Sequence, residues 1–199
     1  MYRWRTLTEE QRRDTLADRL RNKRPWHRPP HFEPDGPQRY ILTAACFEHR
    51  SVIGVSEERL RSFQSDLLSA LAESNTDTHA WCILPNHYHL LVLVDELKDV
   101  LSALGKLHGR TSHHWNGEDD ARGRQVWHGI SDRAIRGERH YFATLNYIHH
   151  NPVEHDLVDT WQDWEFSSAH EFLADTDPAE AKRIWIDYPI LDYGAKWDP

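Results

Sequence analysis

The sequence predicts an α+β fold, an antiparallel sheet with helices on one face, and the periodicity of its apolar residues is the basis for this. Four short segments are apolar in continuous runs or at every second position, which is typical of strands. In longer segments the apolar residues recur at three- and four-residue spacing, which is typical of helices. The order is strand, helix, strand, strand, helix, strand, and one more helix follows. This is the split β-α-β, or ferredoxin-like, arrangement (β-α-β-β-α-β) with an extra C-terminal helix.

The region before the sheet, residues 1–38, differs in composition from the rest. Thr8 to Gln11 read as a capping box that opens a basic helix ending near Lys23. Five prolines between residues 25 and 37 predict an extended arm. We therefore expect an N-terminal basic helix followed by a Pro-rich arm.

The first half of the sheet region begins near Arg39. Residues 39–47 predict a buried strand, and Ser56 caps a helix with leucines and Phe63 on one face. Residues 78–84 and 87–94 predict a hairpin, with the Pro85-Asn86 pair as its tight turn.

The second half repeats the alternation. Apolar residues from Leu97 predict a helix that runs toward Trp115, and a polar loop over 116–125 follows. Residues 126–136 predict the last strand. The final helix is expected over Glu138–His150 and to stop at Asn151-Pro152, because the residue before a proline avoids helical geometry.

The net charge of −8, from 24 Lys and Arg against 32 Asp and Glu, argues at first against nucleic acid as a partner. The charge is unevenly spread, however. Residues 151–199 hold 12 acidic and 3 basic residues, whereas residues 1–50 hold 7 acidic and 11 basic ones. This asymmetry is compatible with an anionic ligand on one face, and an unevenly charged solvated surface is the simpler alternative.

Composition excludes several other classes of protein. With 39% hydrophobic residues and nine Trp, the chain can bury a core, which excludes disorder for most of it. Two cysteines, Cys46 and Cys82, cannot build a disulfide framework. No charged leader and no long apolar run is visible, so we expect a soluble cytoplasmic protein without membrane contact.

Two histidines in the expected hairpin are candidate metal ligands. His87 and His89 are separated by one residue, so strand alternation puts both imidazoles on one sheet face and Tyr88 on the other. Paired imidazoles can bind a divalent metal. The alternative is two ordinary polar residues on a half-solvated strand.

A tyrosine in the last helix is a candidate nucleophile. Asn151 lies four residues after Tyr147, so the two share a helix face if the helix extends that far. A phenol can form a covalent intermediate, and an amide oxygen is a hard ligand for a cation. The alternative is a packing Tyr followed by an Asn that ends the helix.

Basic residues in the stretch from Lys106 to Arg139 are candidate DNA contacts, because cations bind phosphates and Trp side chains can stack on unpaired bases. The alternative is solvated Arg side chains with the Trp residues in the core, and for Trp127 the core is favoured. The basic candidates are Lys106, Arg110, Arg122, Arg124, Arg133, Arg136 and Arg139.

Three motifs, taken in order, resemble one family. WCILPNHYHLLV (81–92) resembles the WxxMPNHxHLL segment of single-tyrosine HUH transposases, and residues 126–136 resemble their WQxxFxDRxIR strand. YIHHNPVEHDLV (147–158) is similar to the YIHxNPVxxGLV segment of the REP-associated tyrosine transposase branch of that insertion-sequence-200-like superfamily, and residues 164–168 also fit it. The resemblance covers about residues 39–170, and residues 171–199 would form an acidic C-terminal extension.

The resemblance implies a metal-dependent endonuclease and strand transferase that acts on single-stranded, hairpin (REP-like) DNA. His87 and His89 would hold Mg²⁺ or Mn²⁺, with Asn151 as a third ligand. Tyr147, on a catalytic last helix, would attack the scissile phosphate and form a 5′-phosphotyrosine. Members of the family occur as monomers and as dimers, so either state is expected.

Two alternatives stay open. The chain departs from the family pattern at Glu154, where a basic or small residue is usual, and at Asp156, where Gly is usual. Negative charge at these two positions would lower DNA affinity but leaves His87, His89 and Tyr147 intact. The second hypothesis is a domesticated protein that binds hairpin nucleic acid without cutting it. A metal-dependent hydrolase is the third, although the chain lacks the HExxH or Cys-rich spacing typical of one.

Overall fold

The computed structural model describes residues 36–191 and 193, with residues 8, 10 and 13 as isolated positions. The elements considered below all belong to one compact unit, Gly36–Tyr193. The basic helix and most of the Pro-rich arm expected over residues 1–38 lie outside the described residues.

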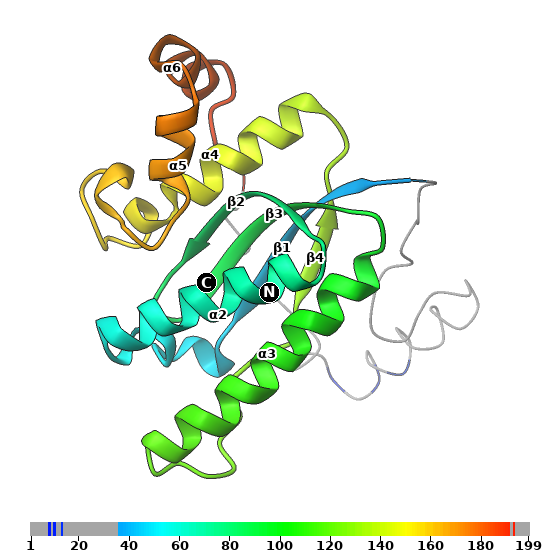
Figure 1. Cartoon of the computed structure of the whole chain (residues 1–199), viewed down its shortest axis with the longest axis vertical. Helices are drawn as coiled ribbons and strands as arrows, with labels where there is room; N and C mark the ends of the chain where they lie inside the picture. The colour runs from blue at the N-terminus through cyan, green and yellow to red at the C-terminus, as the bar shows by residue number, and fades with distance from the viewer. Residues whose placement is uncertain (1–7, 9, 11–12, 14–35, 192, 194–199) are drawn as a thin grey trace. The chain divides into compact units, whose positions relative to one another are not determined.

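A four-stranded antiparallel sheet forms the centre of this unit (Figure 1). Its strand order is β2-β3-β1-β4, and every neighbouring pair is antiparallel. One helix joins the first two strands in sequence and another joins the last two, which confirms the ferredoxin-like arrangement. The strands are β1 (Gln38–Ala45), β2 (Asp77–Ile83), β3 (His87–Val94) and β4 (Ser131–Ala134).

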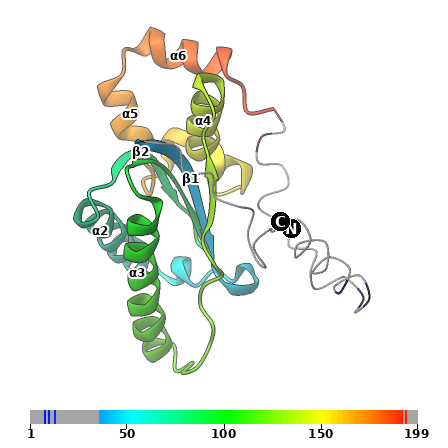
Figure 2. The ribbon, with the colours of Figure 1, turned by 90° about the vertical axis from the view of Figure 1, so that its right-hand side faces the viewer.

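Two helices cover one face of the sheet, α2 (Glu57–Glu73) and α3 (Leu97–Glu118) (Figure 2). The hydroxyl of Ser56 accepts a hydrogen bond from the Arg59 backbone N–H, so Ser56 caps α2 as expected. The main apolar core lies between these helices and the sheet. Trp127 belongs to it, 7% exposed and with its ring stacked on that of His108 at 4.2 Å, which confirms the core position expected for it.

A third long helix, α4 (Glu138–Glu154), contacts β2 and β3. It packs on the face opposite to α2 and α3, because the β3 side chains that meet it alternate with those of the main core. Two short helices, α5 (Ala169–Asp175) and α6 (Pro178–Asp187), follow it. The Asn146 amide on α4 donates to the carbonyls of Ile184 at 3.1 Å and Tyr188 at 2.9 Å, so the segment around α6 is fastened to α4. No helix among the described residues has the length and apolarity needed to cross a membrane.

The last strand is shorter than the sequence pattern predicts. A strand was expected over residues 126–136, but β4 spans only Ser131–Ala134. Trp127 pairs through an isolated bridge with Cys46, the residue that follows β1, and its side chain turns into the main core. The intervening residues therefore leave the regular ladder.

The end of α4 also differs from the expectation. The helix continues through Pro152 to Glu154, four residues beyond His150, so the predicted stop at Asn151-Pro152 is wrong. Pro152 lies in the last turn, where its missing N–H removes a single helical hydrogen bond. The chain then closes the helix with two hydrogen bonds, from Leu157 N–H to the Pro152 carbonyl at 2.9 Å and from Asp156 N–H to the Val153 carbonyl at 3.0 Å.

Candidate active site

The two imidazoles of β3 lie side by side on the face that α4 covers. The ring centroids of His87 and His89 are 4.9 Å apart, and the side chains are 1% and 0% exposed. The turn before them is packed tightly: a Cβ on Gly54 would lie 2.4 Å from the Pro85 Cβ, so only glycine fits there. This contact fixes the turn from which His87 begins.

The ring of His87 is oriented by its neighbour Asn86. The His87 Nδ1–H donates to Asn86 Oδ1 at 2.7 Å, and Asn86 Nδ2 donates to the His49 carbonyl at 3.2 Å. His49 and Glu48 both have left-handed backbone, with φ values of 53° and 55°, which turns this carbonyl back toward Asn86. Because Nδ1 carries the proton of the neutral His87 ring, Nε2 of that ring form presents its lone pair to the site.

His89 is held in a similar way from β1. Thr43 is its register partner, and the Thr43 hydroxyl lies 2.8 Å from His89 Nδ1. The other ring nitrogen, Nε2, lies 3.4 Å from the Tyr147 hydroxyl. Both imidazoles therefore direct Nε2 toward α4.

Helix α4 presents Tyr147 and Asn151 from successive turns of one face, as their spacing predicts. Tyr147 is 5% exposed and Asn151 is 1% exposed. Asn151 Oδ1 lies 3.2 Å from His87 Nε2. Its Nδ2 atom has no hydrogen-bond partner within the part of the chain that the structure describes. Because α4 continues past Pro152, Asn151 is a helical residue and points into the site.

These donors fit a divalent metal. A protonated Nδ1 on His87 leaves Nε2 and the Asn151 oxygen facing each other as two lone-pair atoms, an arrangement that favours a cation between them. Imidazole nitrogen together with an amide oxygen suits Mn²⁺ or Mg²⁺. Among the described residues, no cluster of three His, Cys, Asp or Glu side chains is suited to a metal.

The two other histidines of this helix segment do different things. The His149 ring is 1% exposed, lies 3.0 Å from the Ser168 hydroxyl and stacks on Trp161. Burial lowers the pKa of His149 to about 3, so it is neutral and structural. Burial also lowers the pKa of His150, whose ring contacts Trp185. Neither contributes a contact to the pair of imidazoles on β3.

The structure divides the candidate DNA-contacting residues into two groups. Arg133 lies opposite Ile41 in the sheet register, so its side chain is on the same face as Thr43 and His89. Exposed Arg136 and Arg139 flank the start of α4. The remaining four belong to α3 or the loop after it, which cover the opposite face: Lys106, Arg110, Arg122 and Arg124.

Arg124 is part of a structural ion-pair network. Its guanidinium donates to Asp119 at 2.7 Å, and Arg59 donates to the other Asp119 oxygen at 2.6 Å. The hydrogen bond from Arg59 is the main cause that lowers the pKa of Asp119 to about 2. This network ties α2 to the end of α3. Because the Arg124 guanidinium is already paired with Asp119, it is less able to bind a DNA phosphate.

Four further residues of the site did not emerge from sequence reasoning. Asn86 and Thr43 orient the two imidazoles, the His155 ring lies 4.9 Å from that of His87, and the Tyr193 ring lies 5.6 Å from that of Tyr147. Asn86 stands directly before His87 in the PNHYH motif, and Thr43 belongs to the expected strand over residues 39–47. Both positions could therefore have been identified from the sequence. His155 and Tyr193 depend on how the chain turns after α4, which carries no periodic signal.

Comparisons with known proteins point the same way as the motifs. A 98-residue segment is 30% identical to the REP-associated tyrosine transposase of Escherichia coli (strain K12), covering 49% of this chain and 57% of the relative. The chain is similar to REP-associated tyrosine transposases. A second relative, from Haemophilus influenzae (strain ATCC 51907 / DSM 11121 / KW20 / Rd), is named a putative REP-associated tyrosine transposase and is 25% identical over 134 residues, 58% of this chain and 76% of the relative. The resemblance carried by the three motifs is thereby confirmed.

A solved structure of a REP-associated tyrosine transposase bound to a REP hairpin shares the fold. The match covers 74% of this chain and 86% of that one, with a TM-score of 0.59 and 18% sequence identity. No family model matches the chain. The aligned segment spans just over half of the Escherichia coli transposase, so the likeness extends to a part of that relative's length.

Proposed function

We propose that the chain is a metal-dependent single-strand DNA nuclease and strand transferase that acts on hairpin DNA, the activity of a transposase. The observation that carries the proposal is the convergence of one phenol, two imidazoles and one amide. Tyr147 and Asn151 come from α4, and the two imidazoles come from β3. The Tyr147 hydroxyl lies 3.4 Å from His89 Nε2, and Asn151 Oδ1 lies 3.2 Å from His87 Nε2.

Tyr147 would act as the nucleophile. Its hydroxyl oxygen attacks the phosphorus of a phosphodiester, the bond from phosphorus to the 3′ oxygen breaks, and a 5′-phosphotyrosine forms. The phenol loses its proton and the leaving 3′ oxygen gains one. Since one phosphate ester replaces another, a later attack by a 3′-hydroxyl can rejoin strands without ATP.

The neighbouring residues would prepare this step. Thr43 and Asn86 hold the two imidazoles so that each Nε2 faces α4, and Asn151 completes the donor set. When bound there, Mg²⁺ or Mn²⁺ supplies Lewis-acid polarisation of the scissile phosphate. The Asn151 N–H₂, which lacks a described partner, would donate to a phosphate oxygen.

Hairpin DNA is the proposed substrate because the structural relative is bound to a REP hairpin. Arg133 on the active face, together with exposed Arg136 and Arg139 at the start of α4, is proposed to contact the phosphates of this DNA. Local cations of this kind are compatible with the net charge of −8, which would keep binding to random DNA weak and salt-sensitive.

The test is to incubate the protein with labelled hairpin DNA that has a single-stranded flank, in Mn²⁺ or in EDTA, and to separate the products on a denaturing gel. We expect a protein–DNA adduct that needs Mn²⁺ and is absent from Tyr147→Phe. A domesticated hairpin-binding protein would instead bind this DNA and form no adduct with any REP-like hairpin. An adduct that persists in Tyr147→Phe would show that another residue is the nucleophile.

A further inference from the structure

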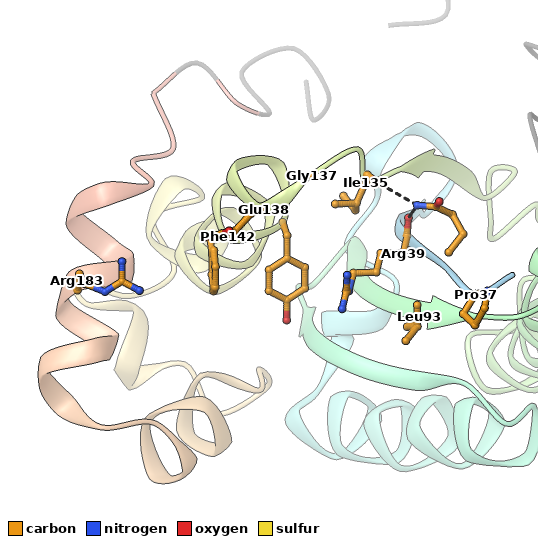
Figure 3. Close-up of a pocket in the computed structure, with 10 residues that line it drawn as sticks. Pro37, Arg39, Leu93, Ile135, Gly137, Glu138, Phe142 and Arg183 are labelled. Atoms are coloured by element: carbon orange, nitrogen blue, oxygen red, sulfur yellow. Dashed lines mark hydrogen bonds between the residues drawn. The ribbon is translucent and has the colours of Figure 1, made fainter. Parts of the chain in front are cut away.

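A second feature of the active face is a pocket of about 620 Å³ at the other end of α4 (Figure 3). Its volume is within the range typical of small-molecule sites. Residues of β1, β3, α4 and α6 line it, among them Arg39, Leu93, Tyr141 and Arg183.

The pocket opens on the same side of the sheet as the two imidazoles. Arg39 and Leu93 are register partners, four residues before Thr43 on β1 and four after His89 on β3. By strand alternation all four side chains lie on one face. The pocket is therefore about 13 Å from His89 along β3, a few nucleotides of an extended strand.

One wall of the pocket combines an aromatic ring with a cation. The Arg39 guanidinium carbon lies 5.2 Å from the centroid of the Tyr141 ring. The Tyr141 hydroxyl is held at 2.8 Å by His79 Nδ1, and the Phe142 ring packs edge-on against Tyr141 at 5.1 Å. The ring is thus fixed before any ligand arrives, and burial raises the pKa of its phenol, so it is neutral.

The rest of the lining suits a planar polar ligand. Leu93, Ile135 and Pro37 are apolar, while Gln38 donates through Nε2 to the Ile135 carbonyl at 2.9 Å and so holds its amide in one orientation. Arg183 from α6 and Arg39 from β1 lie on opposite sides of the pocket (Figure 3). Arg183 is already paired with Glu180 at 2.6 Å, so Arg39 is the cation better able to meet a phosphate.

We infer that this pocket binds one nucleotide of single-stranded DNA, with the base against Tyr141 and a phosphate on Arg39, a short distance along the strand from the scissile phosphate. The inference rests on the proposed function for its substrate class. Aromatic rings hold unpaired bases by stacking, and a guanidinium contributes through both charge and cation–π contact. An anchored nucleotide would fix the position of the strand relative to Tyr147.

The experiment measures binding of the full chain to a short fluorescein-labelled oligothymidylate by anisotropy in EDTA, where no cleavage occurs. We expect Tyr141→Leu to weaken binding roughly tenfold and Tyr141→Phe, which keeps the ring, to bind like the parent. Arg39→Gln should lower the slope of log affinity against log salt by about 0.7, the value for one phosphate contact on a single strand. Arg61→Gln, an exposed arginine of α2 on the opposite face, is the matched control and should leave the slope unchanged.

Several outcomes would overturn the inference. If Tyr141→Leu and Arg39→Gln both bind the strand like the parent while the Mn²⁺-dependent adduct still forms, the pocket is not a strand site although the proposed function stands. If the variants lose binding but no hairpin yields an adduct, the pocket stands and the nuclease proposal fails. If thymidine monophosphate binds as tightly as the oligonucleotide, the pocket takes a free nucleotide and the strand assignment is wrong.

Discussion

His87 Nε2 and Asn151 Oδ1 face each other at 3.2 Å across the interface between β3 and α4. With Asn86 accepting the proton of Nδ1, both facing atoms carry lone pairs when the His87 imidazole is neutral. Two acceptors at this separation favour a cation, and the pair lies beside the contact of 3.4 Å between His89 Nε2 and the Tyr147 hydroxyl. This relationship is the structural basis for placing a metal next to the proposed nucleophile.

Replacing Asn151 tests this metal assignment. Asn151→Ala removes one oxygen ligand and should weaken Mn²⁺ binding about tenfold or more, measured by titration calorimetry on the protein alone. Asn151→Asp supplies a charged oxygen in place of the amide and should bind Mn²⁺ at least as tightly as the parent. Equal affinities in all three proteins would remove Asn151 from the ligand set.

Replacing Asn86 tests how the imidazole is positioned. Asn86→Ala removes the acceptor for His87 Nδ1–H and should lower Mn²⁺ affinity about 10- to 100-fold, the usual effect of losing a partner behind a metal ligand. Asn86→Asp keeps that acceptor, loses the donor to the His49 carbonyl and should retain most of the affinity. Thermal unfolding of both variants serves as the control for folding. A loss of affinity in Asn86→Asp as large as in Asn86→Ala would contradict the assigned role.

The departure from the family pattern at Asp156 has a structural consequence. Asp156 follows the α4 terminus in a left-handed conformation, with φ of 53°, at the position where helices usually have Gly. Asp156→Gly should therefore raise the free energy of unfolding by about 0.5–1 kcal/mol, measured in urea. Asp159→Gly, at an exposed position without positive φ, is the matched control and should not stabilise. A loss of stability in Asp156→Gly would contradict the strain argument.

Buried neutral histidines predict how stability depends on pH. Burial lowers the pKa of His108 to about 4 and that of His149 to about 3, whereas both are near 6.5 in an unfolded chain. Between about pH 4 and 6.5 the unfolded state binds these protons and the native state does not, so stability falls as pH falls, by about 1.4 kcal/mol per pH unit for each group.

The measurement for this prediction is urea unfolding at several pH values in that window. His149→Gln, whose amide can still bond Ser168, should show a slope smaller by about one proton than the parent. His113→Gln, at an exposed position on α3, should keep the parent slope. Identical slopes for the parent and His149→Gln would mean that His149 is protonated in the folded protein.

Much of the site follows from periodicity. Strand alternation correctly put His87 and His89 on one face, and the four-residue spacing put Tyr147 and Asn151 on one side of α4. The sheet order also follows from the sequence of elements, because the ferredoxin-like arrangement is its usual outcome.

Other features depend on tertiary contacts that no local pattern encodes. The penalty that Pro152 imposes on a helix is local and small in a last turn, and the packing of Asn151 against β3 outweighs it. Arg124 looked like a surface cation, but its role is set by Asp119 and Arg59, and Arg59 is 65 residues earlier in the chain. The hydrogen bond from the Asn146 amide to the Ile184 carbonyl likewise joins α4 to α6, and neither helix has a sequence pattern that predicts this contact.

In the proposed reaction Tyr147 forms a covalent bond with DNA, and peptide mass spectrometry of the adduct identifies the residue that is joined. The adduct formed with hairpin DNA in Mn²⁺ is digested with nuclease and protease, and the peptide that retains a nucleotide is sequenced. We expect a 5′-phosphonucleotide on Tyr147 and none in EDTA. A nucleotide on any other residue, or a hairpin that is bound and never joined to the protein, would contradict it.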